Sequence, residues 1–304
     1  MNNALRNNKI LWKAEQYMPD GSFTSGIEGP SCDEMGILYA CNFAEQGTIG
    51  RVKGQEASVF LELPQPSIGN GMVFDTHGTM YIADYVGHNV FKVDMQTKKL
   101  SVHAHEPRMN QPNDLAIMSN GIIFASDPNW SDSTGQLWRV DTDGKTTLLE
   151  RNMGTTNGLE VSPDEKNLYV NETVQQRIWQ YDLDAEGNLS NKKLFHQFEE
   201  FLLDGMRCDV NGNLYVTRYE GSLITILSPQ GEHIRDVELL GANCTNVAFG
   251  GEDGCTCFVT VADKGHVEMF RTDTPGRSWK LLETARQANL KSLKETIPLP
   301  HGRG

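Results

Sequence analysis

The chain repeats one pattern six times at nearly constant spacing. Each copy begins with an acidic residue or asparagine and continues into an apolar run, a polar turn, a second run of the LYV type and a third run such as VFKVD. The copies begin at residues 28, 70, 113, 157, 204 and 246, so successive starts are 42, 43, 44, 47 and 42 residues apart. A fixed period of this length indicates an array of one supersecondary unit.

Each unit has three clear strands and room for a fourth. Candidates for the fourth strand lie at 100–105, 146–150, 193–198 and 234–239. A four-stranded unit of this length is the blade of a β-propeller, whereas a two-layer sandwich would give strands without a fixed period. The sequence therefore predicts an all-β, six-bladed β-propeller with a central channel, formed as a single domain over residues 1–304.

The two ends of the chain lie outside the repeats. The segment KILWKAEQY (9–17) is expected to add an outer strand to the last blade and so close the ring. The tail over residues 284–304 has no blade pattern, and we expect it to pack on the outside or to fray.

The composition limits the class of partner. The chain has 27 Lys and Arg against 40 Asp and Glu, a net charge of −13. This charge argues against a nucleic acid or an anionic membrane as partner and is compatible with a cation and a small-molecule substrate. With six cysteines, no signal peptide and no membrane-spanning run, the protein is expected to be cytoplasmic with reduced thiols. No sequence feature predicts an oligomeric state.

The first residues of the units should meet at one end of the channel, because the first strand of each propeller blade lines it. All six carry side-chain oxygens: Glu28, Asn70, Asn113, Asn157, Asp204 and Asn246. A buried polar ring is costly unless water or a cation satisfies it. Two carboxylates with amide oxygens suit a hard ion such as Ca²⁺. None of the six positions carries His or Cys, which disfavours zinc or copper. We therefore predict one divalent cation, with calcium favoured.

Four motifs give the chain a family resemblance. They are EGP (28–30), PND (112–114), NGLEVSPDEKNLYV (157–170) and DGMRCDVNGNLYV (204–216). With these motifs the sequence resembles the SMP-30/gluconolactonase/luciferin-regenerating-enzyme-like family, six-bladed propellers with a catalytic divalent cation. The resemblance implies that Glu28, Asn157 and Asp204 bind the metal and that Asp204 acts as base or nucleophile. It makes Asn113 a metal ligand or a substrate contact, and it leaves magnesium, manganese, zinc and iron(II) open beside calcium.

The sequence departs from the sugar-lactonase pattern of that family at two positions. Gln111 stands where the vertebrate enzymes have an arginine, and Ser131 stands where they have a sugar-contacting glutamate. A polyol substrate is therefore less favoured. Trp130, in the loop DPNWSDS (127–133), offers either an apolar wall for substrate or packing between blades, and Tyr219 is a further candidate substrate contact.

The predicted function is a divalent-metal-dependent hydrolase that opens a lactone. The metal would act as Lewis acid and Asp204 as base or nucleophile. Hydrolysis of phosphotriesters or fluorophosphates and ring-opening of cyclic diketones are alternatives on the same site. A non-catalytic propeller that binds a partner is an alternative of another class. A metal-free strictosidine-synthase-like propeller is a poor match to the acid–amide ring, the name used here for the six first residues of the units. The chain has no GxSxG motif, which argues against an α/β-hydrolase.

Overall fold

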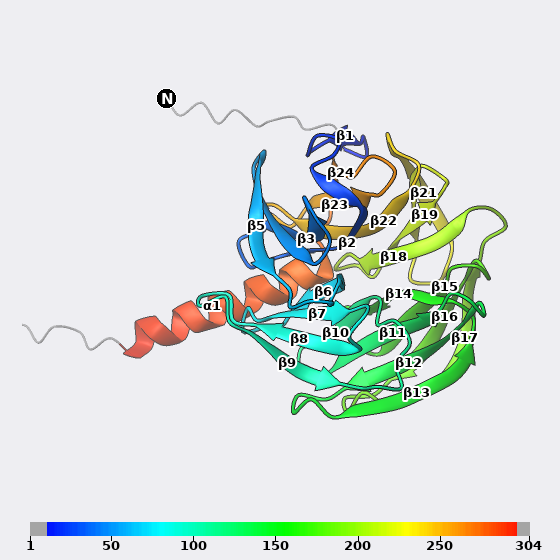
Figure 1. The fold of residues 1–304 in the computed structure, drawn as a ribbon, viewed down its shortest axis with the longest axis horizontal. Helices are drawn as coiled ribbons and strands as arrows, with labels where there is room; N and C mark the ends of the chain where they lie inside the picture. The colour runs from blue at the N-terminus through cyan, green and yellow to red at the C-terminus, as the bar shows by residue number, and fades with distance from the viewer. Residues whose placement is uncertain (1–10, 297–304) are drawn as a thin grey trace, which may run out of the picture.

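The computed structural model describes residues 11–296. Its strands form six four-stranded antiparallel sheets arranged around one axis, as Figure 1 shows. The predicted six-bladed β-propeller is therefore confirmed. One helix is present in the described range, α1 (Arg277–Thr296), and no helix there is long and apolar enough to cross a membrane.

Each blade is a meander of four strands that runs from the axis outward. The innermost strands are β2 (Phe23–Cys32), β6 (Gly69–Phe74), β10 (Leu115–Ile117), β14 (Thr156–Val161), β18 (Leu202–Cys208) and β22 (Cys244–Gly250). The second strands are β3 (Leu38–Phe43), β7 (Met80–Asp84), β11 (Ile123–Asn129), β15 (Asn167–Glu172), β19 (Leu214–Tyr219) and β23 (Thr256–Val261).

The third and fourth strands complete the blades. The third strands are β4 (Thr48–Lys53), β8 (Asn89–Val93), β12 (Thr134–Val140), β16 (Arg177–Leu183), β20 (Leu223–Leu227) and β24 (His266–Arg271). The outer strands are β5 (Glu56–Glu62), β9 (Leu100–His105), β13 (Thr146–Met153), β17 (Leu189–Gln197) and β21 (His233–Glu238). The four outer strands predicted from the sequence are thus confirmed.

The last blade is built from both ends of the chain. The short strand β1 (Glu15–Gln16) pairs antiparallel with β24 and is the outermost strand of the sheet that contains β22, β23 and β24. The prediction that the segment 9–17 closes the ring is confirmed for its described part, while residues 9 and 10 lie outside the described residues.

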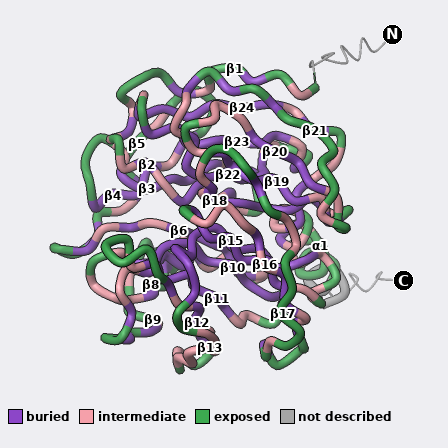
Figure 2. The backbone as a smooth tube through the Cα atoms, turned by 90° about the vertical axis from the view of Figure 1, so that its right-hand side faces the viewer, coloured by how far each residue is buried: buried purple, intermediate pink, exposed green. Residues whose placement is uncertain are grey.

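Burial falls from the inner strands to the outer ones, as Figure 2 shows. All five residues of β7 are buried, whereas five of the six residues of β21 are exposed. Apolar side chains of neighbouring blades pack against one another; Ile49 of the first blade and Ile82 of the second belong to the same cluster. This packing between blades is the source of the hydrophobic stabilisation of the ring.

Glycines after the first residue of a unit let neighbouring inner strands approach closely. A Cβ on Gly29 would lie 1.9 Å from the carbonyl oxygen of Asn70, and one on Gly158 would lie 2.4 Å from that of Asp204. Both distances are far below van der Waals contact, so only glycine fits. The same close approach brings the first residues of the units together.

The tail of the chain, which has no blade pattern, was expected to pack on the outside or to fray. Its residues up to 296 belong to the helix α1, which begins at Arg277 and extends away from the ring at its C-terminal end. Leu282 of α1 is 3% exposed and packs in the same cluster as Tyr39 and Phe74. A pattern of strand repeats contains no signal for a helix that docks through its first turns. Residues 297–304 of the tail lie outside the described part of the chain.

Candidate metal centre

Glu28 and Asp204 lie at the same end of the channel. They stand on the inner strands β2 and β18, close enough for the charge of Glu28 to act on Asp204. Burial, with a smaller contribution from the charge of Asp114, raises the pKa of Glu28 to about 7. Burial and then the charge of Glu28 raise the pKa of Asp204 well above its usual range. Two such carboxyl groups ionise together only when a positive group lies between them.

Two polar groups position Glu28. The backbone N–H of Gly29 donates to Glu28 Oε2 at 2.6 Å, and Asn246 Nδ2 donates to the same oxygen at 3.3 Å. Asn246 Oδ1 in turn accepts from the N–H of Val247 at 2.9 Å. The oxygen of Asn246 is therefore already engaged, and this asparagine orients Glu28 through its amide nitrogen.

The oxygen atoms of Asn70 and Asn157 are free within the described structure. Asn157 Nδ2 donates to Thr173 Oγ1 at 3.1 Å, which leaves Asn157 Oδ1 buried and without a hydrogen-bond partner. Asn70 Oδ1 is also buried and unpartnered. A buried carbonyl oxygen without a partner is destabilising by about 1–3 kcal/mol. Together with the two carboxylates, these oxygens make a donor set that fits a hard divalent cation.

Asn113 lies at the equivalent position of the third blade. It is 5% exposed, and its backbone N–H donates to Ser126 O at 2.9 Å while its carbonyl accepts from Gly71 at 2.7 Å. Within the described residues its side chain makes no hydrogen bond, so its amide is available to a ligand. Across residues 11–296, no group of three or more His, Cys, Asp or Glu side chains is arranged to hold a metal. A cation at Glu28 and Asp204 would therefore need asparagine oxygens as further ligands.

A buried ion pair lies next to the acid–amide ring. Arg207 Nη1 and Nη2 each lie 2.8 Å from one carboxylate oxygen of Asp114, and both side chains are buried. Both oxygens of Asp114 are thereby engaged by one guanidinium. This pair was not predicted from the sequence, because the partners are 93 residues apart. A signal was present, however, since Asp114 occupies the position at which Gly29, Gly71 and Gly158 stand in other units.

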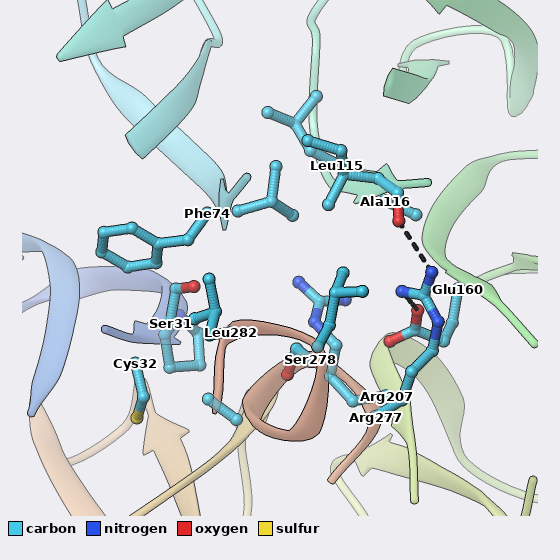
Figure 3. Close-up of a pocket in the computed structure, with 15 residues that line it drawn as sticks. Ser31, Cys32, Phe74, Leu115, Ala116, Glu160, Arg207, Arg277, Ser278 and Leu282 are labelled. Atoms are coloured by element: carbon cyan, nitrogen blue, oxygen red, sulfur yellow. Dashed lines mark hydrogen bonds and ion pairs between the residues drawn. The ribbon is translucent and has the colours of Figure 1, made fainter. Parts of the chain in front are cut away.

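The opposite end of the channel is closed by α1. Arg277, the first residue of α1, donates to Ile117 O at 3.0 Å and to Glu165 Oε1 at 2.8 Å, and it lies 3.5 Å from Glu160. Figure 3 shows the cavity between these groups and the inner strands, with Arg207 on its lining. At about 30 Å³ it has room for one or two water molecules and no substrate. Access to the ring is therefore from the Glu28 end.

The predicted substrate contacts lie at this open end. Tyr219 ends β19, and the charge of Asp204 contributes, after burial, to raising the pKa of Tyr219. Trp130 lies in the loop between β11 and β12 and is 37% exposed. Burial raises the pKa of Tyr85, and the nearby side chains of Trp130 and Gln111 oppose that shift. Tyr85, in the loop after β7, was not predicted from the sequence, because its neighbours come from another blade.

Comparison with known proteins finds similar sequences in one protein family. The profile of the SMP-30/gluconolactonase/LRE-like region matches residues 27–263. The chain is 32% identical to a gluconolactonase of Zymomonas mobilis over 68% of this chain and 64% of that protein. It is 31% identical to the pentonolactonase XacC of Haloferax volcanii over 49% of this chain and 53% of that protein. These matches thus span between about half and two thirds of the relatives' length.

A solved structure supports the same fold. A calcium-binding protein, regucalcin, from Agrobacterium tumefaciens superimposes with a TM-score of 0.74 at 22% identity, over 84% of this chain and 93% of that one. Fold, repeat motifs and the matched region agree, and the chain belongs to the SMP-30/gluconolactonase/LRE-like family.

Proposed function

We propose that this protein is a divalent-metal-dependent hydrolase that opens a lactone. The observation that carries the proposal is the pair of half-buried, electrostatically interacting carboxyl groups of Glu28 and Asp204, at the channel end that also holds the unpartnered oxygens of Asn70 and Asn157. A propeller that serves only as a scaffold has no need for such an arrangement. The relatives named gluconolactonase and pentonolactonase support a lactone as the substrate class.

Glu28, Asn157 and Asp204 would hold the cation, with Asn113 as a fourth ligand or as a contact to substrate. The all-oxygen set favours calcium among the divalent ions. When bound, the cation supplies Lewis-acid polarisation of the lactone carbonyl and stabilises the negative charge that develops on its oxygen.

Asp204 would act either as the general base or as the nucleophile. As a general base, its carboxylate accepts a proton from the water that adds to the lactone carbonyl carbon. The acyl C–O bond of the ring then breaks, the ring oxygen takes up a proton, and the product is a hydroxy acid. In the second route the Asp204 carboxylate attacks the carbonyl carbon and the ring C–O bond breaks, which leaves a mixed anhydride; water then hydrolyses this anhydride to give the same hydroxy acid and free Asp204. Asn246 and Gly29 hold Glu28 in place during either route.

A hydrolysis panel tests the proposal. The purified protein would be assayed by pH-stat on glucono-δ-lactone, γ-butyrolactone, an aryl ester and a phosphotriester, before and after treatment with a chelator and after calcium is restored. We expect lactone hydrolysis that chelation abolishes and calcium restores. Hydrolysis of the phosphotriester alone would move the assignment to that reaction. A lack of hydrolysis with every ion supplied would favour the scaffold.

A further inference from the structure

Four exposed apolar side chains surround the open end of the channel. Val86 is 40% exposed, Trp130 37%, Val174 48% and Phe201 39%. The first three lie in the loops that connect the second and third strands of their blades, and Phe201 lies directly before β18. In an antiparallel meander these loops and the starts of the inner strands share one end of the propeller. We call these four side chains the apolar rim.

Two residues of the apolar rim are close in the chain to residues of the candidate metal centre. Asn157 donates from Nδ2 to Thr173 Oγ1 at 3.1 Å, and Val174 is the next residue of that loop. Phe201 precedes Asp204 by three residues. Val174 and Phe201 are therefore near, along the chain, to residues that form the candidate metal centre.

Hydrogen bonds join the loops of the rim into one continuous wall. Gln175 Nε2 donates to Ser133 O at 3.1 Å, which links the Val174 loop to the Trp130 loop. Gln176 Nε2 donates to Phe201 O at 3.0 Å, which links the Val174 loop to the segment before β18. Trp130 also lies near the hydroxyl of Tyr85, the neighbour of Val86, in the second blade. The wall thus extends from the second blade to the fifth.

Four other exposed apolar side chains lie on the outside of the propeller. Val59, Val102, Leu194 and Ile234 each lie on the outer strand of a different blade, and apolar residues scattered singly over a surface are ordinary. The rim is different because its four side chains lie in loops at the same end of the propeller as the polar site.

We infer that the substrate is a lactone that carries an apolar substituent, with the lactone ring at the acid–amide floor and the substituent against Val86, Trp130, Val174 and Phe201. This inference rests on the proposed lactonase function and specifies its substrate class. The hydroxyl groups of a sugar lactone need polar partners, which these four side chains do not provide. An alkyl or aryl substituent would instead remove both its own apolar surface and that of the rim from water.

A homologous series tests the inference. The value of kcat/KM would be measured for γ-butyrolactone, γ-hexalactone, γ-nonalactone and glucono-δ-lactone with calcium present. Full burial of a methylene contributes up to about 4-fold, so a half-open wall should give roughly 2-fold per added methylene. Trp130→Ala and Val174→Ser should each flatten this dependence on chain length. Val102→Ala, on the outer strand β9 and 56% exposed, is the matched control and should leave it unchanged.

The outcomes separate the two claims. A kcat/KM that does not depend on chain length, or that is highest for glucono-δ-lactone, would overturn the apolar substrate and leave the lactonase in place. An unchanged slope in both rim variants, each shown to be folded by its thermal transition, would also overturn it. A lack of hydrolysis for every lactone would remove the proposed function and the inference with it.

Discussion

Arg207 and Asp114 form a bidentate ion pair at 2.8 Å that joins the fifth blade to the third across the channel. Asp114 is the neighbour of Asn113, and Arg207 follows Asp204 by three residues. The pair therefore ties together two strands that carry proposed site residues. Because both partners are buried, each depends on the other for compensation of its charge.

Removal of one partner should destabilise the protein strongly. In Arg207→Met the carboxylate of Asp114 stays buried without its counter-charge, so the free energy of unfolding should fall by about 3–5 kcal/mol. Urea denaturation followed by circular dichroism measures this loss. The double variant Asp114→Asn/Arg207→Met is the control, and it should lose less than the sum of the single variants. A loss below about 1 kcal/mol in Arg207→Met would show that the pair contributes little.

The pH dependence of stability should reverse when a cation binds. In the metal-free protein the pKa of Glu28 is raised from its usual value near 4.5 to about 7. The folded state then holds a proton that the unfolded state releases, so stability is greatest at low pH and falls as the pH rises between these values. The shift corresponds to a loss on the order of 3 kcal/mol. Calcium needs the ionised carboxylates, and its stabilisation should therefore grow over the same range.

Thermal unfolding at pH 5 and pH 8, with and without calcium, measures this reversal. Glu28→Gln removes the titrating group, so both the pH effect and the calcium effect should shrink. If calcium raised Tm equally at the two pH values in the unmodified protein, the carboxyl pair would not be its binding site.

Asp204→Asn should lower kcat for lactone hydrolysis by at least about 100-fold, because the base or nucleophile is lost. The side chain keeps its shape, so the fold should be retained, as circular dichroism would show. Asp143→Asn, in an exposed turn remote from the ring, is the control and should keep full activity. Calcium titration of both variants tells loss of the chemical step from loss of the ion. Activity within 2-fold of the unmodified protein would remove Asp204 from the reaction.

Gly205→Ala should weaken cation binding without touching a proposed ligand. The added Cβ would lie 1.9 Å from Asn246 Cγ, so Asn246 must move, and its hydrogen bond to Glu28 is disturbed. We expect at least a 10-fold rise in the Kd for calcium and a loss of about 1–3 kcal/mol of stability. Gly26→Ala is the control, since its nearest contact is the flexible end of Gln46 at 3.3 Å. Equal calcium affinity in the two variants would show that Asn246 does not contribute to cation binding.

The fold could be predicted because its signal is repeated six times. Strand runs such as 100–105 match β9 residue for residue, and the closing role of β1 follows from the geometry of a ring. The helix α1 could not be found in this way, because it occurs once and docks mainly through its first turns. A helix outside a repeat needs its own apolar periodicity to be noticed.

The ring residues were predictable for the same reason, since equivalent positions of a propeller meet at its axis. What each residue does was less accessible. Asn70, Asn157 and Asn246 look alike in the sequence, yet the first two have free oxygens while Asn246 uses its own for Val247. The Arg207–Asp114 pair and the contact between Tyr85 and Trp130 join different blades, and a single sequence carries no direct record of such pairings.

The most direct test of the central claim is the divalent-metal content of the gently purified protein, measured by inductively coupled plasma mass spectrometry beside Glu28→Gln and Asp204→Asn. We expect about one divalent ion per chain, calcium foremost, and clearly less in both variants. A protein that holds no divalent ion, and binds none when calcium, magnesium, manganese, zinc or iron(II) is supplied, would contradict the metal centre at Glu28 and Asp204.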